Sequence, residues 1–126
     1  MRPYRYFYAI APSSPSARWF NELLKVERTA TPSAVVARWS CENIYLTEAD
    51  FVPTATASSA SIAAEDEGLL ITIMYNASSD ASLFAVFDAR NLVPRGIYPL
   101  SGLTVPFHAH GIVCLKAAGG RCFTNP

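Results

Sequence analysis

The chain has 126 residues, of which 51% are hydrophobic and 16% are charged, and its formal net charge is zero. This length fits one small domain or part of a larger one. A neutral chain without a basic stripe excludes nucleic acid as a partner, and no apolar run reaches the about 18 residues that a transmembrane helix needs. An apolar fraction this high in a short chain also indicates that further polypeptide covers some of its faces.

The cysteines are Cys41, Cys114 and Cys122, and no two of them form a Cys-x-x-Cys pair. A disulfide framework or a zinc knuckle is therefore not expected. The pattern favours a reducing, intracellular compartment such as the cytosol or a plastid. Cys114 lies in an apolar stretch, where a cysteine is usually a small core residue.

The first half of the chain predicts short strands joined by turns. Aromatic and branched residues dominate 5–11, as in a buried strand, and a Ser/Pro loop follows. Residues 21–27 and 34–39 are further strand candidates, and the short turns between them predict antiparallel hairpins. Residues 40–49 look irregular and polar. The Ser/Ala/Thr-rich stretch 54–64 predicts a surface loop.

The second half contains the strongest strand candidate, 68–75, where nearly every residue is apolar and burial on both faces is expected. The acidic run 65–68 before it is typical of a solvated turn. Residues 81–88 predict its partner strand, and shorter strands are expected over 96–100 and 112–115. The Gly-rich tail 116–126 is expected to be mobile. About seven or eight short strands with regular turns predict an all-β fold, as a sandwich, barrel or propeller.

Both histidines lie close together, in the segment Val-Pro-Phe-His-Ala-His-Gly at 105–111. In an extended segment His108 and His110 point to the same face, which could present nitrogen ligands to a metal. Histidines in a small chain are more often packed or solvent-facing, so the residues alone leave this open. Glu48, taken alone, is best interpreted as a solvated loop carboxylate. No phosphate-binding loop, dinucleotide fingerprint, nucleophile elbow or zinc-protease motif is present.

Six short motifs occur in a fixed order along the chain. They are Tyr6-Phe7-Tyr8-Ala9, Leu23-Leu24-Lys25-Val26-Glu27, Trp39 with Glu48-Ala49-Asp50-Phe51-Val52-Pro53, Glu65-Asp66-Glu67-Gly68, Val86-Phe87-Asp88-Ala89 and Pro106-Phe107-His108-Ala109-His110-Gly111. In this order the chain resembles the C-terminal part of the carotenoid oxygenase family, the carotenoid cleavage dioxygenases and retinoid isomerases. Each motif alone is weak, but the ordered set over nearly the whole of 1–126 is hard to obtain by chance.

The resemblance implies the C-terminal blades of a seven-bladed β-propeller, built from four-stranded antiparallel sheets and incomplete in this chain. In the family, four histidines hold a ferrous iron, Fe(2+), on the propeller axis. The last of these histidines falls on His110, and the other three lie upstream of the matched region. A family glutamate that hydrogen-bonds a ligand imidazole maps to Glu48, which is therefore expected to pair with His110 and to aim it at the metal.

The implied function is the C-terminal segment of a non-haem iron(II) dioxygenase that oxidatively cleaves a conjugated double bond of a carotenoid or apocarotenoid. Its partners would be an apolar polyene and dioxygen, with membrane contact through parts of the parent protein outside this chain. The isolated chain is expected to be inactive, and none of its residues is expected to act as a general base or nucleophile.

Two departures from the family pattern predict an altered site. Ala49 replaces a proline after the glutamate, and His108-Ala109 replaces Gly-Phe just before the ligand. The alternative interpretation is a small metal-free β-sandwich binding module, in which His108 and His110 contact a ligand or solvent. Three further histidines upstream, each in its own strand, would favour the oxygenase.

Overall fold

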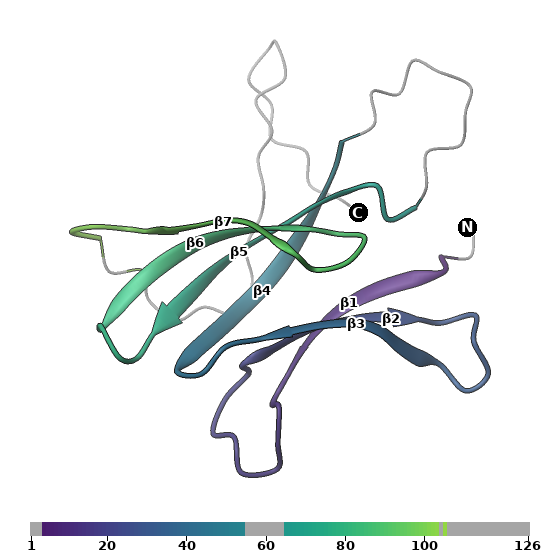
Figure 1. Ribbon diagram of the computed structural model, residues 1–126, viewed down its shortest axis with the longest axis horizontal. Helices are drawn as coiled ribbons and strands as arrows, with labels where there is room; N and C mark the ends of the chain where they lie inside the picture. Colours follow the sequence, from purple (N-terminus) through teal and green to yellow (C-terminus); the bar gives the residue numbers. More distant parts are fainter. Residues whose placement is uncertain (1–3, 55–64, 104, 106–126) are drawn as a thin grey trace.

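The computed structural model describes residues 4–54, 65–103 and 105, which form seven strands in two antiparallel sheets (Figure 1). The strands are β1 (Tyr6–Ala11), β2 (Glu22–Glu27), β3 (Ala34–Ser40), β4 (Ile44–Pro53), β5 (Gly68–Asn76), β6 (Ala81–Asp88) and β7 (Pro94–Pro99). One sheet has the order β1-β2-β3 and the other has the order β4-β5-β6-β7. The all-β prediction is confirmed. No helix in the described ranges is long and apolar enough to cross a membrane.

Six of these strands coincide closely with the stretches that the sequence predicts, because apolar and β-branched residues mark them. In β5, buried residues such as Leu70 and Met74 alternate with half-buried residues such as Ile71 and Ile73. The expectation of burial on both faces is therefore wrong for one face. The buried face points to the other sheet, so β5 behaves like a strand of a two-layer packing.

Strand β4 is the element that the sequence does not predict. The assignment of 40–49 as irregular is confirmed for 41–43 and is wrong for 44–49. The strand begins at Ile44 and pairs with β5, but the register shifts between Leu46 and Ala49. Thr47 and Glu48 form this bulge, where the buried Thr47 hydroxyl donates a hydrogen bond to the Ile73 carbonyl at 2.8 Å. A bulge breaks the alternation of side chains, which hides the strand in the sequence.

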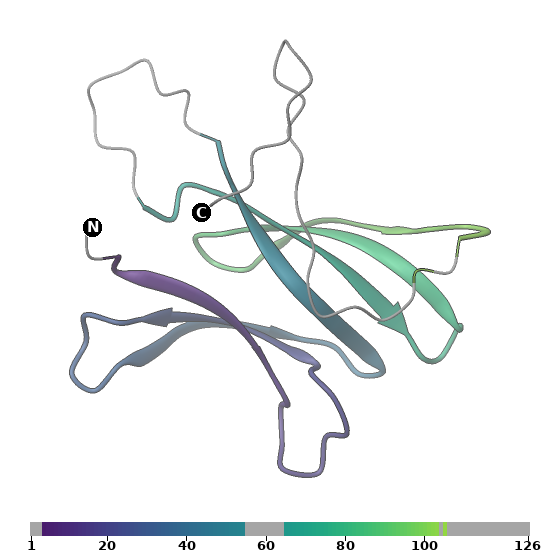
Figure 2. The same cartoon turned by 180° about the vertical axis from the view of Figure 1, so that it is seen from behind.

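The hydrophobic core lies between the two sheets, which form two stacked layers (Figures 1 and 2). Its largest fully buried side chains are Phe87, Leu23, Leu46, Leu70, Met74 and Leu92. Trp39 of β3 packs edge-on against Phe87 of β6, with ring centroids 4.9 Å apart. Burial of each such side chain stabilises the fold by about 1.5–3 kcal/mol. The core is therefore formed by side chains of both sheets together, and neither sheet forms it alone.

The four strands β4 to β7 form one antiparallel meander in sequence order, which is the unit of a propeller blade. The predicted loop 54–64 beyond Thr54, the predicted strand 112–115 and the predicted mobile tail 116–126 lie outside the described residues. So do His108 and His110.

Candidate functional site

Glu48 lies at the bulge of β4, opposite the edge of β1. Its side chain is exposed, and it lines a cavity of about 300 Å³ together with Ala49 and with Tyr8, Ala9 and Ile10 of β1. Glu48 thus belongs to strand β4. The prediction that it lies in a loop is wrong. The bulge interrupts the regular alternation of side chains along β4, and Glu48 borders the cavity between β4 and β1.

The predicted partner of Glu48 cannot be placed, because His110 lies outside the described residues. The pairing of Glu48 with His110 therefore stays a prediction. Within 4–54 and 65–103, no group of three or more His, Cys, Asp or Glu side chains could hold a metal ion. The described part of the chain consequently does not form an iron site by itself, and any such site needs residues from elsewhere.

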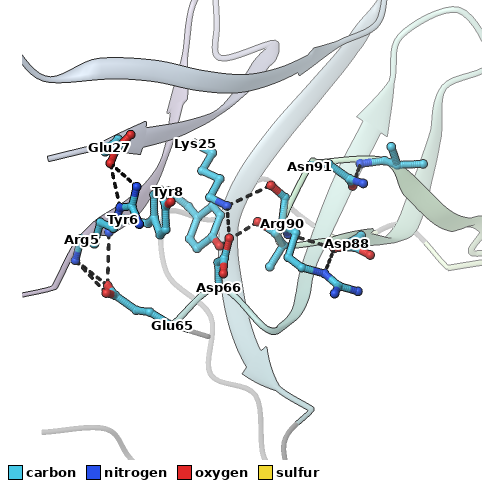
Figure 3. Close-up of polar contacts among 12 residues, drawn as sticks. Arg5, Tyr6, Tyr8, Lys25, Glu27, Glu65, Asp66, Asp88, Arg90 and Asn91 are labelled. Atoms are coloured by element: carbon cyan, nitrogen blue, oxygen red, sulfur yellow. Dashed lines mark hydrogen bonds and ion pairs between the residues drawn. The ribbon is translucent and has the colours of Figure 1, made fainter. Parts of the chain in front are cut away.

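A polar cluster, formed by Lys25, Asp66, Tyr6, Tyr8 and Glu65, joins the two sheets at one end (Figure 3). The Lys25 side chain is only 3% exposed. Its Nζ lies 2.5 Å from Asp66 Oδ2, donates to the Arg90 carbonyl at 2.9 Å, and sits 4.2 Å from the centre of the Tyr6 ring. A carboxylate, a carbonyl oxygen and an aromatic ring thus surround the ammonium group, and these partners let its charge be buried.

Tyr8 connects this cluster to the Glu48 cavity. Its hydroxyl donates to the Ala89 carbonyl at 2.8 Å, and its ring stacks on Phe51 of β4 with centroids 6.0 Å apart. Burial raises the pKa of the Tyr8 hydroxyl, and the nearby Asp66 and Glu65 carboxylates raise it further. The hydroxyl therefore stays protonated and acts as a hydrogen-bond donor.

The sequence predicts a solvated acidic turn before β5, but this turn makes specific contacts with the other sheet. Glu65 accepts hydrogen bonds from the backbone N–H groups of Arg5, at 2.8 Å to each oxygen, and of Tyr6 at 3.2 Å. Asp66 holds the buried Lys25, which lies 41 residues earlier. The turn thus binds the start of β1 and the middle of β2.

A second charged group stabilises the turn between β6 and β7. Asp88 accepts a hydrogen bond from the backbone N–H of Arg90 at 2.9 Å, and it pairs with Arg95 at 2.5 Å. The Arg95 contact, followed by the Arg90 N–H, lowers the pKa of Asp88 to about 2. This turn supplies the Ala89 and Arg90 carbonyls to Tyr8 and Lys25, so Asp88 shapes the acceptor side of the polar cluster.

Sequence reasoning missed the roles of Tyr8, Lys25 and Asp66, although all three lie in the motifs singled out above. The available signal was Lys25 itself, a lysine between Leu24 and Val26 in an otherwise apolar strand. A lysine in such a place is almost never buried without a partner. The sequence also did not predict a second cavity of about 390 Å³, which is lined by Arg18, Trp19, Tyr45 and Tyr75.

The sequence matches the family model for RPE65, retinal pigment epithelial membrane protein, over residues 1–112. A search of curated proteins gives no match. The cobalt-substituted Synechocystis ACO superposes on the chain with a TM-score of 0.64 and 25% identity, over 79% of this chain and 20% of that chain. A single-residue mutant of Synechocystis apocarotenoid oxygenase (ACO) gives the same values. An ACO/RPE65 chimera, at 22% identity and a TM-score of 0.64, supports the fold alone.

The chain therefore spans about a fifth of the length of these solved structures. The family match includes the bulge with Glu48 and continues through the segment that holds His108 and His110. The two described sheets correspond to part of a carotenoid oxygenase β-propeller, as the sequence predicts. The chain belongs to the RPE65 family of carotenoid oxygenases.

Proposed function

We propose that this chain is the C-terminal segment of a non-haem iron(II) dioxygenase that oxidatively cleaves a conjugated double bond of a carotenoid or apocarotenoid. It would contribute one metal ligand, His110, and the carboxylate that orients it, Glu48. The chain alone would be inactive, since a single imidazole cannot hold iron tightly.

One observation carries the proposal: the family match runs without interruption from β1 past His110, over residues 1–112. The solved structures support the proposal, because they include a cobalt-substituted Synechocystis ACO and a mutant of Synechocystis apocarotenoid oxygenase. Neutral imidazoles suit ferrous iron. A carboxylate bonded to the far ring nitrogen fixes the histidine tautomer and the orientation of its ring.

The position of Glu48 is compatible with this role. It sits on a paired strand, at a bulge, and faces a cavity large enough to admit another side chain. The departures Ala49 and His108 flank the two proposed functional residues, so we expect a site that retains the ligand but has altered surroundings.

The test is a graft in which this chain replaces the corresponding fifth of Synechocystis apocarotenoid oxygenase. The graft should bind one metal ion and cleave an apocarotenoid, while the chain alone should do neither. His110→Ala should remove the metal, because the site loses a ligand. Glu48→Gln should weaken metal binding by about 10- to 100-fold, as expected for a residue that orients a ligand.

His108→Ala is the matched control, because it removes the neighbouring imidazole and should leave the metal content unchanged. Metal analysis of the purified grafts measures both variants. Full metal occupancy in the His110→Ala graft would refute the ligand assignment. Polyene cleavage by the isolated chain would contradict the proposal that it is a segment of a larger enzyme.

A further inference from the structure

We propose that Lys25 and Asp66 form a latch between the two sheets, and that both are positioning residues for Glu48. The term latch here means the Lys25–Asp66 ion pair with the Lys25 contact to the Arg90 carbonyl. The inference rests on the proposed function only for the role that it gives to Glu48. The latch itself is carried by the contacts of the described residues.

The latch joins elements that are far apart in the sequence. Lys25 lies in β2 of the three-stranded sheet, whereas Asp66 and Arg90 lie in the β4–β5 and β6–β7 turns of the other sheet (Figure 3). The Lys25 side chain is 3% exposed and the Asp66 side chain is 17% exposed. An ion pair that water reaches so little is much more sensitive to the loss of one partner than a surface pair is.

The latch also fixes the position of β1, the strand that faces Glu48 across the cavity. Lys25 pairs with Tyr8 in the β1–β2 register, so both side chains project to the same side of that sheet. Tyr8 is fixed at its hydroxyl by the Ala89 carbonyl, and its residue lines the Glu48 cavity. Neither Lys25 nor Asp66 lines that cavity. They therefore act on Glu48 through the placement of β1 against β4.

The ion pair Arg38–Glu22 provides a contrast. It joins β3 to β2 within one sheet, at 3.3 Å, and the Arg38 side chain is 66% exposed whereas the Glu22 side chain is 11% exposed. Because water reaches the Arg38 guanidinium, the pair is weaker than one with a buried cation, and it fixes nothing between the sheets. Arg38→Gln is therefore a matched control, since it removes a cation and breaks an ion pair without touching the latch.

The first measurement is the thermal unfolding midpoint of the full 126-residue chain. Asp66→Asn should lower the midpoint by roughly 10 °C or more, because it leaves the Lys25 charge buried and unpaired. The double variant Lys25→Met with Asp66→Asn should unfold at a higher temperature than Asp66→Asn alone, since it removes that charge. Arg38→Gln should lower the midpoint by less than about 5 °C, because the Arg38 side chain is exposed and the glutamine can still donate a hydrogen bond to Glu22.

The second measurement separates positioning from stability. In amide NMR spectra at 25 °C, where the variants remain folded, Lys25→Met should shift the Glu48 and Ala49 resonances, and Arg38→Gln should not. The double variant extends this comparison if a single variant fails to fold. Unchanged Glu48 and Ala49 resonances in both Lys25→Met and the double variant would overturn the positioning role. An Asp66→Asn midpoint equal to that of the unmodified chain would overturn the latch.

These outcomes are independent of the metal. Retention of metal by a His110→Ala graft would refute the proposed function and leave the NMR result standing. Absent NMR shifts would refute the positioning role and leave the graft result standing.

Discussion

Asp88 is a buried carboxylate whose charge is stabilised by two neighbouring arginines. Its carboxylate accepts from Arg95 and from the Arg90 N–H, which lower its pKa from 3.8 to about 2. A carboxyl group with a lowered folded-state pKa contributes stability that is present above its unfolded pKa. That contribution is lost as the pH falls from about 4 to about 2. Because both arginine side chains are more than half exposed, screening reduces it to about 1 kcal/mol.

We therefore expect Asp88→Asn to lower the free energy of unfolding by about 1 kcal/mol at pH 7. The asparagine oxygen can still accept from the Arg90 N–H, so the variant isolates the charge. Denaturant titrations from pH 2 to pH 7 measure the difference. The free energies of unfolding of Asp88→Asn and of the unmodified chain should converge toward pH 2. Glu42→Gln, at an exposed position, is the control, and its free energy of unfolding should show no such convergence with that of the unmodified chain. A difference that grows toward low pH would contradict this account.

At the scale of single residues, the sequence could supply Glu48 and His110 only through the resemblance of their motifs. A carboxylate in a stretch without regular alternation is usually solvated, and nothing in residues 40–49 shows that β1 lies opposite. The Lys25–Asp66 pair was beyond sequence reasoning for the same reason, since the partners are 41 residues apart. Their pairing depends on how the two sheets stack, which no local pattern specifies.

The strands were predictable where one face is mostly apolar. Leu70, Met74, Leu83 and Phe87 mark β5 and β6, and these strands pair in register from Leu69 with Asp88 to Asn76 with Ala81. The same logic fails in β4. There the bulge at Thr47 and Glu48 shifts the phase of the alternation, and a polar segment then resembles a loop.

Gly68 at the start of β5 gives a test of how tightly the strands meet. A Cβ at this position would lie 2.6 Å from the Phe51 ring and 2.6 Å from the Val52 carbonyl oxygen. The carbonyl belongs to the paired strand and cannot move aside. Gly68→Ala should therefore lower the free energy of unfolding by about 1–3 kcal/mol, measured by chemical denaturation.

Gly96→Ala, in the edge strand β7 of the same sheet, is the control. The three atoms nearest to a Cβ there all belong to the Tyr98 side chain, which is 55% exposed and can rotate away. The free energy of unfolding should change by no more than about 0.5 kcal/mol. Equal losses in the two variants would mean that general strand preference, and not the close approach of β4, explains the glycine at 68.

At the scale of the whole molecule, the two sheets cover each other on one face only. Phe7 pairs with Val26, and Val26 pairs with Val35 across a register shift in the three-stranded sheet. Phe7 is 39% exposed and Val35 is 45% exposed. In a propeller both faces of a blade are packed by neighbouring blades, and an apolar row left in water favours association.

We expect the purified chain to self-associate through this row, with a sedimentation coefficient that rises with protein concentration. Val35→Lys should abolish the rise, because burying the row would then also bury an unpaired ammonium group. Val93→Lys is the matched control, since Val93 is 50% exposed but lies on the β6–β7 turn. A sedimentation coefficient independent of concentration, or equal effects of the two lysines, would show that this apolar row is not a packing surface.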